Sequence, residues 1–102
     1  MIRHRFVVDG VELDVICGRP TIRGECDLSN ATEIAGWLSS FGRGAIEVDL
    51  SGVTFFDAAA LHALLATVRR NPNMRIVEPS PIVRRVLEIT DTYAVLTGGQ
   101  RV

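Results

Sequence analysis

Side chains that could act as catalysts or metal ligands are few and scattered in this sequence. The two histidines, His4 and His62, and the two cysteines, Cys17 and Cys26, lack the spacing of a metal site. HExxH, CxxC, GxSxG, P-loop and GxGxxG motifs are absent, and no lysine is available to form a Schiff base. We therefore expect no enzymatic activity, no metal ion and no cofactor, with His62 at a helix surface.

The two cysteines are predicted to be free thiols. A turn signal at Gly18-Arg19-Pro20 reverses the chain, so Cys17 should face position 20 and lie several residue pairs from Cys26. A disulfide between them is therefore not expected, and both are predicted to be small buried residues of a cytoplasmic protein. A redox switch at Cys17 or Cys26 is the alternative interpretation.

Two carboxylates occupy positions next to predicted element ends. Asp27 follows Gly24-Glu25-Cys26 at the end of a predicted strand, where by itself it is a loop carboxylate. Asp57 directly precedes a predicted helix, where a carboxylate accepts hydrogen bonds from free N–H groups and meets the positive end of the dipole. Asp57 is therefore predicted to be an N-cap.

The first third of the chain is predicted to form strands, over residues 3–28. The runs RFVV and VELDVI flank Asp9-Gly10, which tolerates the positive φ angles of a tight hairpin turn, and TIRGEC follows the second turn. A helix is predicted over 31–41, because Asn30 and Glu33 form a pattern like a capping box and apolar residues recur at helical spacing. Gly42 is predicted to follow its C-terminus.

Strands and helices alternate in the rest of the chain. The predicted elements are a strand over 45–50, a loop over 51–57, a helix over 58–70, a strand over 74–77, a helix over 81–89 that begins at Ser80-Pro81, and a short strand or turn with a frayed tail over 92–102. Hairpins make neighbouring strands antiparallel, whereas strand–helix–strand units make them parallel. The sequence thus predicts an α/β fold, a mixed sheet with three to four helices packed on it.

Length and composition are those of one globular domain over residues 1–102. The chain is 47% hydrophobic and 23% charged, with a formal net charge of −1. Such a balance does not favour nucleic acid or an anionic membrane as a partner. No apolar run has the length of a membrane span, and the first ten residues lack the apolar region of a secretory signal.

Three segments, in unbroken order over about residues 10–97, resemble the STAS domain of anti-sigma factor antagonists. GECDLSNA (24–31) is similar to its G-E-[LIV]-D start, and VDLSGVTFFDAAALHALL (48–65) to its central D-[LF]-S-x-V-x-[FY]-[ILM]-D-S-[ST]-G signature. RIVEPSPIVRRVLEITDTYAVL (75–96) is similar to its closing strand and helix. The resemblance implies a mixed sheet with packed helices, which agrees with the fold predicted above.

The resemblance also implies a function in bacterial partner switching, the control of transcription in responses such as stress. An antagonist of this type binds an anti-sigma factor that is also a histidine-kinase-like serine kinase, and so frees the sigma factor. The kinase phosphorylates a serine just after the aspartate that matches Asp57, and the phosphate breaks the interface by its charge. The resemblance implies that this chain is such a non-catalytic interaction module.

The sequence departs from the family pattern at the phosphorylation site itself. The family's D-S-[ST]-G is Asp57-Ala58-Ala59-Ala60, so neither Ala58 nor Ala59 can accept a phosphoryl group. Three interpretations follow: an antagonist that is always in its binding state, a switch moved to Ser29, Ser51 or Thr54, or a STAS domain with another role. The last includes a subunit of a phospholipid-type ABC transporter or a signalling scaffold.

We expect the partner to dock at the start of the helix predicted over 58–70 and at the loop around Asp27. The predicted partner-binding residues are Asp27, Ser29, Asn30, Phe56, Asp57, Ala58, Ala59, Ala60 and Leu61. Ser51 and Thr54 are expected in the loop before that helix. The chain itself is expected to be a monomer or a weak homodimer.

Overall fold

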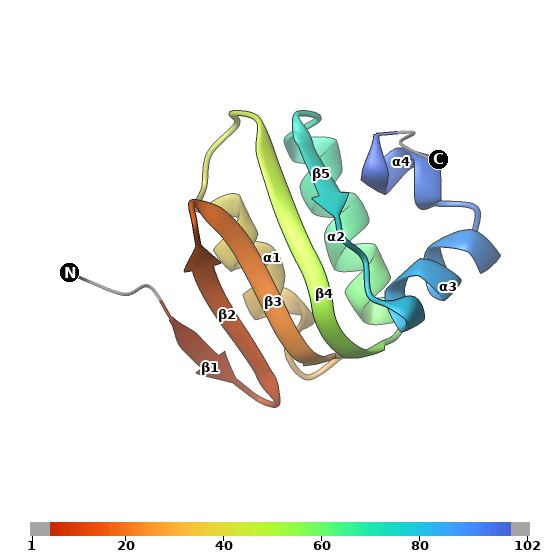
Figure 1. Cartoon of the computed structure of the whole chain (residues 1–102), viewed down its shortest axis with the longest axis horizontal. Coiled ribbons are helices and arrows are strands. Elements are labelled where there is room, and N and C mark those ends of the chain that lie inside the picture. The colour runs from red at the N-terminus through yellow and green to blue at the C-terminus, as the bar shows by residue number, and fades with distance from the viewer. Residues whose placement is uncertain (1–4, 99–102) are drawn as a thin grey trace.

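Five strands form one mixed sheet, and their order in the sheet is their order in the chain (Figure 1). The computed structural model describes residues 5–98. The strands are β1 (Phe6–Val8), β2 (Val11–Ile16), β3 (Arg19–Cys26), β4 (Ile46–Phe56) and β5 (Met74–Val77). Strands β1 to β3 pair antiparallel, whereas β3, β4 and β5 pair parallel. The mixed sheet predicted from the sequence is confirmed.

Four helices complete the domain. They are α1 (Ala31–Ser39), α2 (Ala58–Arg70), α3 (Pro81–Ile89) and α4 (Tyr93–Thr97). Helices α1 and α2 lie side by side against one face of the sheet, and α3 and α4 lie on the β5 side (Figure 1). The core between them consists of aliphatic side chains from both layers, among them Leu13, Ile22, Leu38, Leu50, Leu64 and Leu87. Burial of such side chains is the main term that stabilises the fold.

Two tight turns join the antiparallel strands. Asp9 and Gly10 have φ angles of 42° and 88°, as the hairpin prediction requires. The second turn is Cys17-Gly18, with φ angles of 52° and 75°, and Arg19 already belongs to β3. The prediction of a turn at 18–20 was therefore wrong by one residue. The prediction that Cys17 is buried was also wrong, because a two-residue turn exposes its side chains to solvent.

Strand β4 is longer than predicted, since it runs from Ile46 through Phe56 and includes the expected loop. The pairing of β4 with β3 continues as far as Phe56, which lies opposite Cys26. Strand β3 therefore supplies hydrogen-bond partners to the backbone of the expected loop, and the local sequence does not reveal these partners. Gly52 allows β3 and β4 to approach, because a Cβ atom there would lie 2.6 Å from Arg23 Cγ. Ser51 and Thr54 are consequently exposed strand residues and not loop residues.

Two further differences from the predicted elements concern the end of α1 and the C-terminal segment. Helix α1 ends at Ser39, two residues before the predicted end, and Gly42 lies in the following loop. The predicted C-terminal strand or turn is the short helix α4, because Tyr93 and Leu96 lie one helical turn apart and are both buried. Gly98 ends α4 with a φ angle of 74°. His4 and the predicted frayed tail after residue 98 lie outside the described residues.

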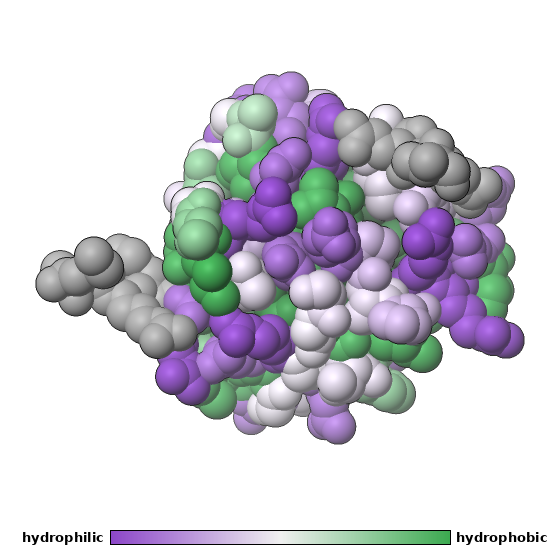
Figure 2. Space-filling view, viewed as in Figure 1, coloured by the Kyte–Doolittle hydropathy of each residue, from purple (hydrophilic) through white to green (hydrophobic). Residues whose placement is uncertain are grey.

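The other face of the sheet is polar and faces the viewer in Figure 2, where hydrophilic and neutral side chains predominate over the strands. Arg23 Nε lies 3.5 Å from Glu12 Oε1, and Arg23 Nη2 lies 3.8 Å from Asp14 Oδ2. Asp14 is fully buried beneath these side chains. A second pair joins Arg19 Nη2 to Glu47 Oε1 at 3.1 Å. This face is thus organised by charge pairs between neighbouring strands.

Candidate functional site: the edge at the ends of β3 and β4

The ends of β3 and β4 bring the two predicted aspartates to one edge of the domain. The strands pair in parallel, so both chains leave the sheet side by side after Cys26 and Phe56. Asp57 N donates a hydrogen bond to Cys26 O at 3.3 Å, which ties the two exits together. Asp27 and Asp57 are the first residues beyond these strand ends. The edge therefore combines the two segments on which the predicted docking site depended.

The Asp57 carboxylate bonds to both segments of this edge. Its Oδ1 accepts a hydrogen bond from Ala60 N at 3.0 Å, which confirms the predicted N-cap of α2. Its Oδ2 accepts from Leu28 N at 3.3 Å, a contact that the sequence did not predict. One side chain thus stabilises the start of α2 and fixes the loop before α1.

Asp27 and Ser29 form a local turn in that loop. Asp27 Oδ1 accepts hydrogen bonds from Ser29 N at 2.9 Å and from Ser29 Oγ at 2.5 Å. A short Asp side chain that bonds to the backbone two residues onward is a recurrent turn device. Asp27 therefore shapes the loop in addition to presenting a charge, and the Ser29 hydroxyl is exposed but engaged as a donor.

Asn30 does not cap α1 with its side chain, which corrects the capping prediction. Its Oδ1 accepts from Asp27 N at 3.0 Å, and its Nδ2 donates to Asp9 O at 2.9 Å and to Glu25 O at 2.8 Å. The side chain is 0% exposed. A buried amide that satisfies three backbone groups is worth more there than at a solvated helix end. Asn30 thus joins the β1–β2 turn to the loop that contains Asp27.

Burial divides the nine predicted partner-binding residues into a surface set and a supporting set. The side chains in or partly in solvent are those of Asp27, Ser29, Asp57, Ala58 and Ala59. The side chains in the interior are those of Asn30, Phe56, Ala60 and Leu61. The interior four support the edge from within, and their contact with a partner stays a prediction.

Leu28 is the residue of this edge that the sequence analysis missed. It is 79% exposed, and it lies between Asp27 and Ser29 with its backbone held by Asp57. The signal was present as a single large apolar residue inside a polar loop, outside any helical or strand period. Ile89 of α3 and Val95 of α4 are exposed as well, so it is the place of Leu28 between two segments of the edge, and not its exposure, that distinguishes it.

A shallow groove continues from Leu28 between α1 and α2. Its volume is about 650 Å³, and small side chains such as Ala35, Ala59 and Ala63 line it. The groove ends near Arg70, at the C-terminus of α2. A partner that covers Leu28 can therefore extend along the two helices with little steric obstruction.

The alternative phosphorylation sites differ in their distance from the start of α2. Ser51 lies five residues before the end of β4, roughly 16 Å away along an extended strand. Thr54 is exposed near the end of β4, and Ser29 belongs to the edge itself. Only Thr54 and Ser29 therefore lie close to the position of a phosphate in the family pattern.

Electrostatics at the edge are acidic and act on Cys26. Burial raises the pKa of the Cys26 thiol from 9.0 to about 12, and the nearby carboxylates Asp27 and Asp57 contribute to this rise in that order. The thiolate is the reactive form, so a buried thiol with this pKa is inert at neutral pH. Cys17 and Cys26 are both free, as predicted, with Cys17 at the opposite end of the sheet.

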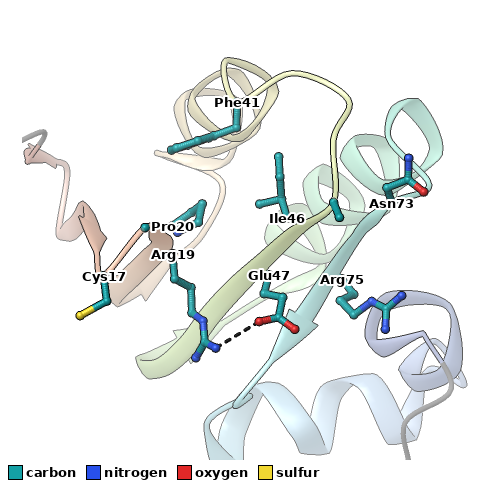
Figure 3. Close-up of a pocket in the computed structure, with 10 residues that line it drawn as sticks. Cys17, Arg19, Pro20, Phe41, Ile46, Glu47, Asn73 and Arg75 are labelled. Carbon is teal, nitrogen blue, oxygen red and sulfur yellow. Dashed lines mark hydrogen bonds and ion pairs between the residues drawn. The ribbon is translucent and has the colours of Figure 1, made fainter.

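A pocket lies at that opposite end, and the residues that line it form no catalytic constellation. It measures about 440 Å³, and Figure 3 shows the Arg19–Glu47 pair at its mouth with Pro20, Phe41 and Ile46 around it. In the same view Cys17 Sγ is directed away from Arg19 and Glu47 (Figure 3). The polar groups of this pair are thus bonded to each other and not aimed at a common substrate position.

Residues 5–98 also lack a metal-binding cluster and a helix that could span a membrane. No group of three or more His, Cys, Asp or Glu side chains in this range could hold a metal ion. No helix there has the length and apolar character to cross a membrane. His62 is exposed on α2, as predicted.

The conspicuous feature of this small mixed α/β domain is the surface edge at the ends of β3 and β4. Residues 10–97 match the family model described as "Mlab, STAS domain", and the chain belongs to the STAS-domain family. STAS domains are generally non-catalytic, and the chain is a STAS-type protein-interaction module. A search of curated proteins found no match.

Proposed function

We propose that this STAS domain is an anti-sigma factor antagonist that acts in bacterial partner switching in the cytoplasm. The partner is an anti-sigma factor of the histidine-kinase-like serine kinase type, as the resemblance of the three segments implies. The observation that supports this proposal best is the double hydrogen bond of Asp57. It joins the start of α2 to the loop before α1 in one surface, with Ala58 exposed at the first helical position.

We name the docking surface by its exposed and half-exposed residues, Asp27, Leu28, Ser29, Asp57, Ala58 and Ala59. Leu28 is the apolar side chain that a partner pocket would bury, and full burial of a leucine contributes about 1.5–3 kcal/mol. The only charged residues within 24–31 and 53–61 are acidic. Charge complementarity therefore calls for a partner with basic groups around an apolar pocket.

The proposal includes the loss of the usual switch. Ala58 and Ala59 have no hydroxyl to phosphorylate, yet the methyl group of Ala keeps nearly the shape of an unmodified serine. A phosphate at position 58 would add about −1.5 to −2 charges beside Asp57 and Asp27, in a surface whose own charged residues are all acidic. The chain in its native form thus always presents the surface of the binding state.

A second candidate function is a STAS subunit of a phospholipid-type ABC transporter. The absence of a hydroxyl at Ala58 and Ala59 favours it, because such a subunit binds its ATPase without a phosphoserine switch. The same docking surface would then contact a transporter ATPase. The two candidates differ in the partner and not in the face that binds it.

Affinity capture from the native host distinguishes these functions. The wild-type chain should retain a histidine-kinase-like anti-sigma factor, and both Ala58→Glu and Leu28→Asp should release it. Val95→Glu places the same kind of charge on an exposed apolar residue of α4 and serves as the matched control. Transporter subunits in place of an anti-sigma factor support the second candidate. Retention by both charged variants would show that the docking surface is elsewhere.

Rebuilding the switch tests the mechanism directly. The Ala58→Ser variant should accept the γ-phosphoryl group of ATP from the captured kinase on its new hydroxyl oxygen, and then dissociate from the kinase. The wild-type chain should stay unmodified and bound under the same conditions. Phosphate on wild-type Ser29, Ser51 or Thr54 would instead mean that the switch has moved.

A further inference from the structure

One end of the sheet is an open strand edge with exposed apolar side chains. Strand β1 is the first strand of the sheet, and among residues 5–98 it pairs only with β2 and has no helix beside it (Figure 1). Phe6 is 51% exposed and Val7 is 69% exposed. An uncovered edge presents unpaired backbone N–H and C=O groups to another strand.

The hairpin geometry shows which backbone groups of β1 are unpaired within the domain. Val8 and Val11 close the two-residue turn at Asp9-Gly10 and form a hydrogen-bonded pair, as is usual for such turns. Antiparallel pairs alternate, so the next pair, Val7 with Glu12, is not hydrogen-bonded. The N–H and C=O of Val7 therefore point away from β2, toward the open edge.

The charges along this edge are complementary to an antiparallel copy of itself. The segment Arg5-Phe6-Val7-Val8-Asp9 has a positive end, an apolar middle and a negative end. With Val7 on a twofold axis, Phe6 lies opposite Val8 of the second copy, and Arg5 at the start of one strand meets the Asp9-Gly10 turn of the other. Both contacts occur twice. A parallel arrangement would instead place Arg5 beside Arg5.

The side chains of the domain support this register. Arg5 Nε lies 2.6 Å from Glu12 Oε2, so the guanidinium is already held on the polar face of the hairpin. Asn30 and Glu25 fix the Asp9-Gly10 turn, since Asn30 Nδ2 donates to Asp9 O and Glu25 N donates to Gly10 O. Both ends of the edge are thus positioned before a second copy arrives, which reduces the entropic cost of association.

We propose that the chain forms a weak symmetric homodimer by antiparallel pairing of two β1 strands about Val7, which joins the two five-stranded sheets into one. The contact is short, and it therefore belongs to the small and transient class of interfaces. It lies at the β1 edge, and Asn30 connects the Asp9-Gly10 turn at one end of this edge to the loop that contains Asp27. This inference does not depend on the proposed function.

Sedimentation velocity over a wide range of concentration tests the dimer. Wild-type protein should show reversible monomer–dimer exchange. Val7→Pro removes the outward N–H on both copies and should weaken the dimer at least about tenfold, through two lost hydrogen bonds. Val7→Thr keeps the N–H and the β-branched shape and serves as the matched control, which should still dimerise. A wild-type chain that stays monomeric at every concentration would overturn the proposal.

A charge exchange tests the register, even if the proline disturbs β1. Arg5→Glu and Asp9→Lys should each weaken the dimer alone, because each places like charges opposite one another twice. A mixture of the two variants should form heterodimers, since this brings the introduced Glu opposite the introduced Lys and leaves the native pair intact. Association that survives Val7→Pro, or a mixture that associates no better than its parts, would mean that another surface or another register joins the copies.

Discussion

Leu28 and Asp57 lie 29 residues apart in the sequence and are joined by one hydrogen bond, from Leu28 N to Asp57 Oδ2 at 3.3 Å. The other oxygen of the same carboxylate caps α2 through Ala60 N. A single side chain therefore sets both the start of a helix and the position of the exposed leucine next to it. Four predictions test how this edge and its surroundings are built.

Replacement of Asp57 should separate its two roles. Asp57→Ala removes the N-cap and should lower the free energy of unfolding by about 1 kcal/mol. Asp57→Asn keeps an oxygen for Ala60 N, and so should lose much less stability. Its amide group replaces the second oxygen, however, so the Leu28 N–H should exchange with solvent faster. Urea unfolding and amide hydrogen exchange measure these effects.

Ser80→Ala is the matched control for the first effect, because Ser80 Oγ caps α3 through Val83 N far from Leu28. It should cost a similar free energy and leave the Leu28 exchange rate unchanged. Equal exchange rates of Leu28 in wild type and Asp57→Asn would contradict the role assigned to Oδ2.

Loss of the Asn30 amide should be the most costly polar change in the edge. Asn30→Ala leaves Asp27 N, Asp9 O and Glu25 O without their partner in a buried place. Each unsatisfied group costs about 1–3 kcal/mol, and we expect a total loss of at least about 3 kcal/mol in the free energy of unfolding. Asn73→Ala removes one exposed hydrogen bond to Arg43 O and should cost well under about 1 kcal/mol. Denaturant titration of both variants gives the comparison, and equal losses would refute it.

Alkaline pH should destabilise the domain through Cys26. Burial together with Asp27 and Asp57 raises the pKa of this thiol from 9.0 to about 12, so the folded state holds its proton longer than the unfolded state. The contribution of the protonated Cys26 thiol to the free energy of unfolding is complete below about pH 9. It falls as the pH rises toward about 12, by roughly 1.4 kcal/mol per pH unit at most. Unfolding free energies measured across this window should fall less steeply in Cys26→Ala. The exposed thiol variant Cys17→Ser should keep the wild-type slope, and a wild-type slope in Cys26→Ala would rule the explanation out.

Two glycines should respond to alanine in opposite ways. Gly24 has a φ angle of 103°, and a Cβ atom there would lie 2.4 Å from Gly10 O, so Gly24→Ala should destabilise the domain by several kcal/mol. Gly36 lies on the exposed side of α1 with no atom within 4 Å of such a Cβ. Gly36→Ala should therefore stabilise the domain, by about 0.5–1 kcal/mol. Melting temperatures of the two variants should move in opposite directions, and a shift of the same sign would contradict the backbone argument.

The Asp9-Gly10 turn, the Asp57 cap and the Ser80-Pro81 helix start were all predictable, because each depends on hydrogen bonds within a few residues of chain. Helix α2 was predictable as well, because its apolar residues recur at helical spacing within one short segment. Membership of the STAS-domain family, which the resemblance over about residues 10–97 indicated, was confirmed as well.

Other features depended on segments that the chain brings together only when it folds. Asn30 was predicted to cap a helix, but its amide is used by Asp9, which lies 21 residues away. Strand β4 continued past Leu50 because β3 offered it partners as far as Phe56.

The sequence by itself determined the family and the order of the elements up to α3, since local hydrogen bonds and apolar periodicity are properties of short segments. The tertiary structure alone decided which side chains of the edge are accessible. Phe56 and Leu61 became core whereas Leu28 became surface, because burial depends on what the rest of the chain places beside a residue.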